Sequence, residues 1–354
     1  MRRVTYTVVA ALGLSGCGQW QRVGTTEQPQ PGTTVPRLFD AVTTYRSMGF
    51  LVGRGTLPFV ADVRYLAGPR PDTALAVIAV SLTNQVLDFQ REGGEFVATY
   101  RVEVTFTPDT GKQVGAAREE RVRVRTFQET LRTDESVIFQ HIVRVPAGKQ
   151  VVVLQVRDSR GPHVGRAERT DTVAHLAPPM LSRPLAYYEG AGRDSLGEVP
   201  RLLSNPKSTL PYGGDTLRFY VEAYGVPAGT RLAAQVVDQS GGVLWRDTVS
   251  LRGGSIAVAR FAFPPTLLSV GQGGFEVSAV GLPITTRAPM LVSFSGQWVI
   301  TNLEDMVFML RFFERQDEVE KLRKAAPAQP RRRSTFTSTC RPSPFSESVM
   351  PRRW

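Results

Sequence analysis

Most of the chain alternates apolar and polar residues with a period of two, which is typical of β-strands with one buried face. Between residues 57 and 176, turn-forming groups such as Gly93-Gly94 and Pro146-Ala147-Gly148 separate these runs. Short strands with regular turns and no helices between them predict an antiparallel β-sandwich, which we place with a short preceding helix in residues 36–176. The apolar positions of one such strand are Tyr100, Val102, Val104 and Phe106.

A second set of period-two strands follows the proline-rich break at Ala177-Pro178-Pro179. Residues 177–298 are therefore predicted to form a second sandwich, so the expected fold class is mainly β with two tandem antiparallel, Ig-like modules. The motifs Val145-Pro146-Ala147-Gly148 and Val226-Pro227-Ala228-Gly229 each lead into an apolar strand. This repeat favours two related modules, although such tetrapeptides are also common in unrelated β-domains.

Helical periodicity is confined to the two ends of this β-rich region. Pro36 opens a short stretch with apolar residues every three or four positions, which Gly49 ends. A capping box at Thr301 and Glu304 predicts a second, amphipathic helix over residues 299–326. Its apolar stripe either packs on the second sandwich or binds a protein partner, and the candidate partner-binding residues are Met306, Leu310 and Phe313.

The N-terminus resembles a bacterial lipoprotein signal over residues 1–17. Arg2 and Arg3 precede a short apolar run. This run is too short to span a bilayer, which requires a helix of about 20 residues. Peptidase recognition is expected at Leu14, Ser15 and Gly16, and lipidation at Cys17. Residues 18–35 form the expected flexible tether. The predicted partner is therefore a membrane, reached through two or three acyl chains on Cys17, and Gly18 favours the outer membrane or periplasmic face.

Charge does not change this expectation. The chain of 354 residues has a formal net charge of +11, but residues 325–354 contribute +5 and the leader contributes +2, which leaves +4 on the body. Because no basic stripe interleaved with aromatic residues occurs there, nucleic-acid binding is not expected. Residues 327–354 have no periodicity and are predicted to be a disordered basic tail.

No catalytic, metal-binding or cofactor-binding constellation is evident in the sequence. His141 has the parity of a core residue, and His163 and His175 have no cysteine partner for a zinc site. Asp158 and Asp238 follow apolar strands, where a turn-capping role is expected rather than calcium binding. No G-x-S-x-G elbow or P-loop is present, so the chain is not expected to be an enzyme. Trp245 and Trp298 are interpreted as packing residues, with sugar stacking as the alternative.

The order of features resembles the GWxTD domain-containing proteins. The likeness covers roughly residues 1–326 and includes the stretches 124–131, 134–137 and 212–217 and the helix start at 298–306. The C-terminal Gly-Trp-x-Thr-Asp motif that names this family does not occur in the chain. We therefore expect a frameshift or truncation near Gln329, where an amphipathic helix gives way to basic sequence. The resemblance implies architecture and location, and it carries no functional residue.

These observations predict a lipid-anchored, extracytoplasmic lipoprotein that acts as a binding or assembly module at the cell envelope. Sheet edges, loops or the C-terminal helix would bind a protein partner. Two alternatives remain: a truncated GWxTD-domain protein whose active domain is missing, and a surface carbohydrate-binding module. For the latter, Tyr220 and Tyr224 share parity with Arg218 and Glu222 and are expected on an exposed sheet face.

Overall fold

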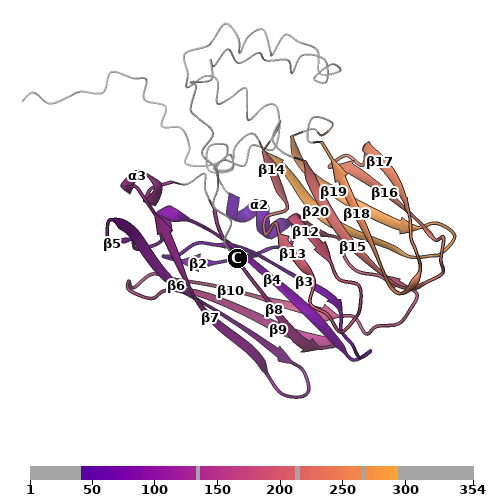
Figure 1. Cartoon of the computed structure of the whole chain (residues 1–354), viewed down its shortest axis with the longest axis horizontal. Coiled ribbons are helices and arrows are strands. Elements are labelled where there is room, and N and C mark those ends of the chain that lie inside the picture. The colour runs from indigo at the N-terminus through magenta and orange to yellow at the C-terminus, as the bar shows by residue number, and fades with distance from the viewer. Residues whose placement is uncertain (1–40, 133–135, 212–215, 265–267, 269, 294–354) are drawn as a thin grey trace, which may run out of the picture. The chain divides into compact units, whose positions relative to one another are not determined.

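A computed structural model of the protein describes residues 41–132, 136–211, 216–264, 268 and 270–293. Nearly all described elements are β-strands, and they form four sheets (Figure 1). The predicted mainly β fold with antiparallel sheets is confirmed; among the described strands, one short parallel pair joins β14 to β20. None of the described helices has the length and apolar content needed to cross a membrane.

The first sandwich consists of sheets A and B. Sheet A has the strand order β1 (Leu51–Val52), β3 (Val60–Ala67), β4 (Thr73–Thr83) and β8 (Ser136–Pro146). Sheet B has the order β2 (Arg54–Gly55), β10 (Val164–Val173), β9 (Gly148–Asp158), β6 (Glu95–Pro108) and β5 (Gln90–Glu92), and β7 (Val114–Val124) also pairs with β6. The period-two apolar positions of both sheets meet in one buried core, which includes Ile78, Tyr100, Val102, Phe106 and Leu154.

The second sandwich consists of sheets C and D. In sheet C, β15 (Leu217–Val226) is central and pairs with β11 (Met180–Leu181), β12 (Leu185–Gly192) and β18 (Gly254–Phe263), and β13 (Arg201–Ser204) pairs with β12. Sheet D has the order β14 (Thr209–Pro211), β20 (Thr285–Ser293), β19 (Gly271–Ala279), β16 (Arg231–Asp238) and β17 (Val243–Ser250). Its core is aromatic, with Phe219 stacked on Phe275 at a centroid distance of 4.4 Å.

Three short helical elements accompany the strands within the described residues. Helix α2 (Ala41–Ser47) lies in the predicted N-terminal helix, and the hydroxyl of its buried Tyr45 lies 2.9 Å from Thr209 Oγ1 of β14. The 3-10 helix η1 (Asn84–Val86) and helix α3 (Phe127–Thr130) lie between strands, where no helix was predicted. Each is a single turn, too short for a helical period to show in the sequence.

The outer faces of sheets A and C pack against each other. Apolar residues of β3, β4, β12, β13 and β15 form one buried cluster: Leu66, Leu75, Val77, Leu185, Tyr187, Leu202 and Tyr220. The side chain of Gln140 on β8 bonds the edge of β13, donating to the Leu202 carbonyl at 2.7 Å and accepting from the Ser204 N–H at 2.7 Å. The two sandwiches therefore share an interface with its own core.

A buried ion pair lies at this junction. Arg193 and Glu222, whose side chains are both 0% exposed, form a bidentate pair with two N–O distances of 2.8 Å. Arg193 also donates to the carbonyls of Leu196, Glu198 and Ala67, the last belonging to β3 of the first sandwich. All five guanidinium donors are thus used.

The expectation that Tyr220 and Tyr224 lie on an exposed face is wrong. Both tyrosines are 1% exposed, and both hydroxyls donate to Glu222 between them. Burial raises the pKa of each tyrosine above its usual value, so both remain donors. The Tyr224 hydroxyl also accepts the Ala67 N–H at 2.9 Å. This face of β15 is covered by the first sandwich, which removes the coplanar exposed aromatics that the carbohydrate-binding alternative required.

Candidate functional site

Among the described strands of the first sandwich, β7 and β8 each form a free sheet edge of eleven residues without a register shift, and we consider β7 first. Residues 114–124 pair with residues 96–106 of β6 without a register shift. On its other side, β7 has no strand partner among the described residues. Strand β8, the edge of sheet A, follows β7 in the chain through α3. We call this pair of neighbouring edge strands, formed by Val114–Val124 and Ser136–Pro146, the β7–β8 seam (Figure 1).

Two charged residues of β7 occupy core-facing positions of the seam. Arg118 pairs with Val102 and Glu120 pairs with Tyr100, and both of these β6 residues are buried in the core. Arg118 and Glu120 share the parity of the half-buried Val122, yet both are exposed. Charges in such positions disfavour pairing of β7 with an apolar edge, and they favour a strand that offers polar or oppositely charged side chains. The core-facing positions of β7 at the seam are therefore polar and exposed.

Titratable side chains of β6 and β8 lie near these two charges. His141 of β8 has the core-facing parity that was predicted, and it is partly exposed beside Phe139. Burial lowers the pKa of His141, and the positive charge of Arg118 lowers it further. Burial raises the pKa of Tyr100, and the negative charge of Glu120 raises it further. The charges of β7 therefore act on side chains of β6 and β8 within the seam.

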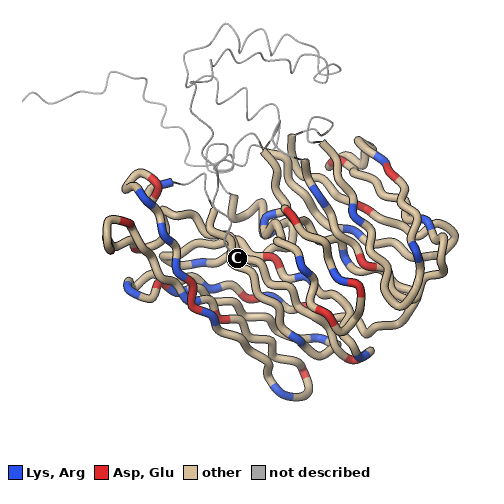
Figure 2. The backbone as a smooth tube through the Cα atoms, in the orientation of Figure 1, with Lys and Arg blue, Asp and Glu red and all other residues tan. Residues whose placement is uncertain are grey.

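The solvent face of sheet B beside β7 carries charges of both signs. Arg121 pairs with Glu92, and Arg123 lies 3.5 Å from Glu95. Figure 2 shows positive and negative residues interspersed along β6 and β7. These pairs are largely exposed, so they contribute little to stability. Their arrangement favours recognition of a partner with mixed charge over one of a single sign.

Helix α3 closes one end of the seam. Its N-cap Thr126 accepts the Glu129 N–H at 3.3 Å, and the Glu129 carboxylate accepts the Arg125 N–H at 2.9 Å. That backbone hydrogen bond lowers the pKa of Glu129. The capped turn holds Phe127 and Leu131 at the surface, where they are 61% and 55% exposed. Two adjacent apolar side chains are thus available next to the free edge of β7.

Several residues singled out in the sequence lie outside the described residues. These are the lipobox residues Leu14, Ser15, Gly16 and Cys17, the candidate partner-binding residues Met306, Leu310 and Phe313, and Trp298. The predicted packing residue Trp245 lies within the described residues. The centroid of its ring lies 4.9 Å from that of Phe263, which confirms the packing role.

The turn-capping role predicted for two aspartates is confirmed. Asp158 Oδ1 accepts the main-chain N–H groups of Arg160 and Gly161 at 2.8 and 3.0 Å. Asp238 Oδ1 accepts the N–H groups of Ser240 and Gly242 at 2.9 and 2.7 Å. Each carboxylate therefore fixes the turn after its strand, as Asx-type turns do.

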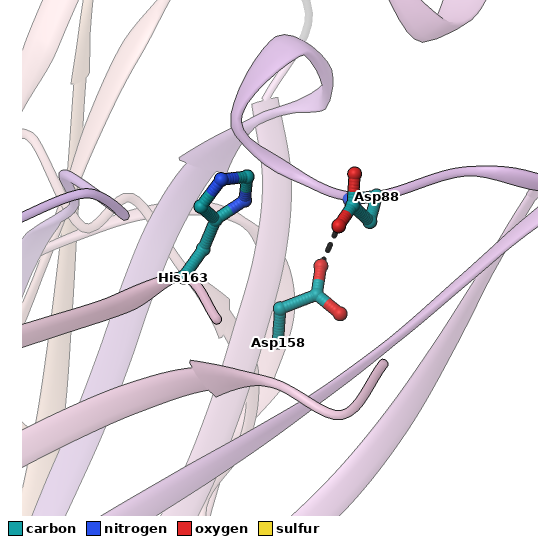
Figure 3. Close-up of side chains that lie close together, drawn as sticks. All are labelled: Asp88, Asp158 and His163. Atoms are coloured by element: carbon teal, nitrogen blue, oxygen red, sulfur yellow. Dashed lines mark hydrogen bonds between the residues drawn. The ribbon is translucent and has the colours of Figure 1, made fainter. Parts of the chain in front are cut away.

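The Asp158 turn also contains a grouping that sequence reasoning missed. Asp88, 70 residues earlier in the chain, places its carboxylate next to Asp158 and His163 (Figure 3). One ligand atom from each residue lies within 4.8 Å of the others. No local sequence pattern connects Asp88 with Asp158, because the two residues lie 70 positions apart. These three side chains are the described residues best placed to hold a metal ion.

A shallow hollow of about 340 Å³ lies on sheet D. It is lined by polar residues of β16, β17 and β19, among them Gln235, Arg246, Asp247 and Glu276. Gln235 donates to Glu276 at 2.8 Å, so these two groups already satisfy each other. The hollow lacks the apolar walls that usually bury a small ligand.

Comparison with known proteins identifies no family. No protein-family model matches the chain, and no curated protein matches it. Among solved structures, the chain is similar to a biofilm-associated protein BSP domain, with 9% identity, a TM-score of 0.21, and coverage of 72% of this chain and 54% of that one. It is also similar to a bacterial adhesin from Mobiluncus mulieris that contains disulfide, isopeptide and ester cross-links, with 10% identity, a TM-score of 0.16, and coverage of 62% and 80%. The chain thus spans about half the length of the first structure, and at these TM-scores neither likeness carries an argument about function.

Proposed function

We propose that the protein is a lipid-anchored binding or assembly module of the cell envelope that adds an extended segment of a partner protein to β7. The observation that carries this proposal is the free edge of β7, which runs for eleven residues without a register shift. A strand added to such an edge gains main-chain hydrogen bonds, and alternate side chains supply specificity.

The second sandwich offers a matched comparison, because β17 is the edge of sheet D and lies beside β18 of sheet C. There, Trp245 takes a core-facing position opposite Val236 and packs on Phe263. A register shift also interrupts the pairing of β16 with β17 between Val236 and Val237. An aromatic side chain thus packs between β17 and β18, and a register shift interrupts the pairing of β17, which makes β17 a poor template for strand addition.

The chemistry of the seam specifies the partner segment. Arg118, Glu120 and His141 take core-facing positions of the seam, so a strand bound to β7 is expected to place polar or charged side chains at alternate positions. Phe127 and Leu131 provide an apolar contact at one end. We infer an extended segment of mixed charge that carries an apolar residue near one end.

Photo-crosslinking in intact cells tests this binding mode. A photoreactive amino acid in place of Glu120 on β7 is expected to yield a discrete adduct with an envelope protein. The same residue in place of Asp247 on β17 is the control, because both positions are exposed acids on edge strands. Equal adducts at both positions, or none at Glu120, would contradict strand addition at β7.

Lipid attachment is tested separately. Wild-type protein is expected to incorporate labelled palmitate and to sediment with membranes, because Cys17 follows a lipobox-like sequence. Cys17→Ser should abolish both, whereas Cys340→Ser, which changes the other cysteine, should leave both intact. Labelling that survives in Cys17→Ser would refute the anchor without affecting the crosslinking result.

A further inference from the structure

Three potential metal ligands converge at one end of the first sandwich, outside the β7–β8 seam. Asp158 is the last residue of β9, and His163 precedes β10 in the same turn. Asp88 lies between η1 and β5. Figure 3 shows the three side chains side by side, and their ligand atoms all lie within 4.8 Å of one another.

The carboxylate of Asp158 is held rigidly. It is 1% exposed, and its Oδ1 accepts two main-chain N–H groups of the turn. Its Oδ2 accepts the Asp88 N–H at 2.8 Å. An ionised carboxylate has about four lone-pair sites, so Oδ2 retains capacity for one further partner.

The described residues provide no cationic partner for either carboxylate and no hydrogen-bond partner for one nitrogen of His163. Neither Asp88 nor Asp158 forms a salt bridge with a described Lys or Arg, since Arg160 of this turn pairs with Glu92 and Gln90. His163 Nδ1 is buried without a hydrogen-bond partner. Two adjacent carboxylates attract a cation, and a buried imidazole nitrogen without a partner is destabilising unless something binds it.

The turn also provides space for this grouping. Gly161 follows Asp158 and Arg160 in the turn, and a Cβ at Gly161 would lie 2.2 Å from Asp88 Oδ2. Any other residue would therefore displace the Asp88 carboxylate from its position beside Asp158 and His163. The φ of Gly161 is not in the left-handed region, so the conflict for a side chain there is with the Asp88 carboxylate, which would have to rotate away.

We propose that Asp88, Asp158 and His163 bind a divalent transition-metal ion, with Zn²⁺ as the best match. A set of one imidazole and two carboxylates suits such an ion better than Ca²⁺, which prefers oxygen ligands. Zinc bonds to these groups are about 2.0–2.2 Å long, so the ligands need to move inward slightly, and the exposed Asp88 is free to rotate. The ion would join the β9–β10 turn to the segment before β5 and retain an open coordination position.

Isothermal titration with ZnCl₂ tests the site on the full-length protein after treatment with EDTA. Wild-type protein is expected to bind one Zn²⁺ saturably and to show a higher Tm with the ion bound. His163→Ala should weaken the affinity at least tenfold. His175→Ala is the matched control, because His175 is exposed and lies outside the cluster, and it should bind as the wild type does.

A second variant keeps the test decisive if His163→Ala fails to fold. Asp88→Asn changes an exposed carboxylate and leaves intact the main-chain N–H that bonds Asp158. Its Zn²⁺ affinity should also fall at least tenfold, with an unchanged circular dichroism spectrum. Absence of saturable binding in the wild type, or wild-type affinity in Asp88→Asn, would overturn the proposal.

Discussion

Glu222→Ala is expected to lower the free energy of unfolding by about 3–5 kcal/mol, the usual loss when one partner of a buried ion pair is removed. The substitution leaves Arg193 buried at 0% exposure with two donors unpaired. It also removes the acceptor for the hydroxyls of Tyr220 and Tyr224. Chemical denaturation of wild type and variant under identical conditions measures the difference.

A double substitution distinguishes the free energy lost by leaving a buried charge unpaired from the free energy lost by removing packing contacts. Arg193→Met combined with Glu222→Leu removes both charges and is expected to recover a large part of the stability lost in Glu222→Ala. A loss below about 1 kcal/mol in Glu222→Ala would contradict the conclusion that this buried ion pair stabilises the junction of the two sandwiches. Because Arg193 also bonds the Ala67 carbonyl of β3, the effect reports on the junction of the two sandwiches.

Phe275→Ala should destabilise the protein by about 3–5 kcal/mol, the range for truncating a fully buried phenylalanine. Phe275 is 0% exposed and stacks on Phe219 at 4.4 Å with an interplanar angle of 4°. It also contacts the rings of Phe261, Phe263 and Trp245. The same denaturation measurement gives the loss.

Phe127→Ala is the matched control for this core truncation. Phe127 is 61% exposed on α3, so its removal should change the free energy of unfolding by about 0.5 kcal/mol or less. Similar losses in the two variants would show that Phe275 does not occupy a close-packed core. Retention of stability by Phe127→Ala would also provide a folded protein in which to examine the apolar end of the seam.

The strand pattern was predictable because alternate residues of a strand point to opposite faces of its sheet, and one of these faces lies in the core. Tyr100, Val102, Val104 and Phe106 alternate with polar residues in the sequence, and all four lie in the first core. Aspartates after strands also act locally, so the turn caps of Asp158 and Asp238 follow from sequence position. The hydrophobic period and the turn-forming residues depend only on neighbouring positions, so a single sequence is sufficient to identify them.

The junction between the sandwiches was not predictable in this way. Strand β15 alternates Arg218, Tyr220, Glu222 and Tyr224 with apolar residues, and that pattern predicts an exposed polar face. In the structure, the first sandwich covers this face, and Glu222 is neutralised by Arg193 from 29 residues earlier. A period of two shows which residues share a face, but it does not show whether another domain covers that face.

Both sites depend on long-range placement. No local sequence pattern distinguishes Arg118 and Glu120 from other charged residues, and only the register of β7 with β6 puts them on the core-facing side. Asp88 reaches Asp158 because the segment before β5 passes over the β9–β10 turn. The pairing of strands thus determines these groupings, and a search for nearby ligands along the chain does not find them.

Hydrogen exchange measured in envelope membranes and on purified protein is the most direct test of strand addition at β7. Main-chain N–H groups in residues 114–124 should exchange more slowly in membranes, where the partner segment is present, than in the purified protein. Residues 243–250 of β17, an edge strand of the other sandwich, should exchange equally in both samples. Equal exchange of residues 114–124 in both samples would contradict the proposal that β7 binds a partner strand in the envelope.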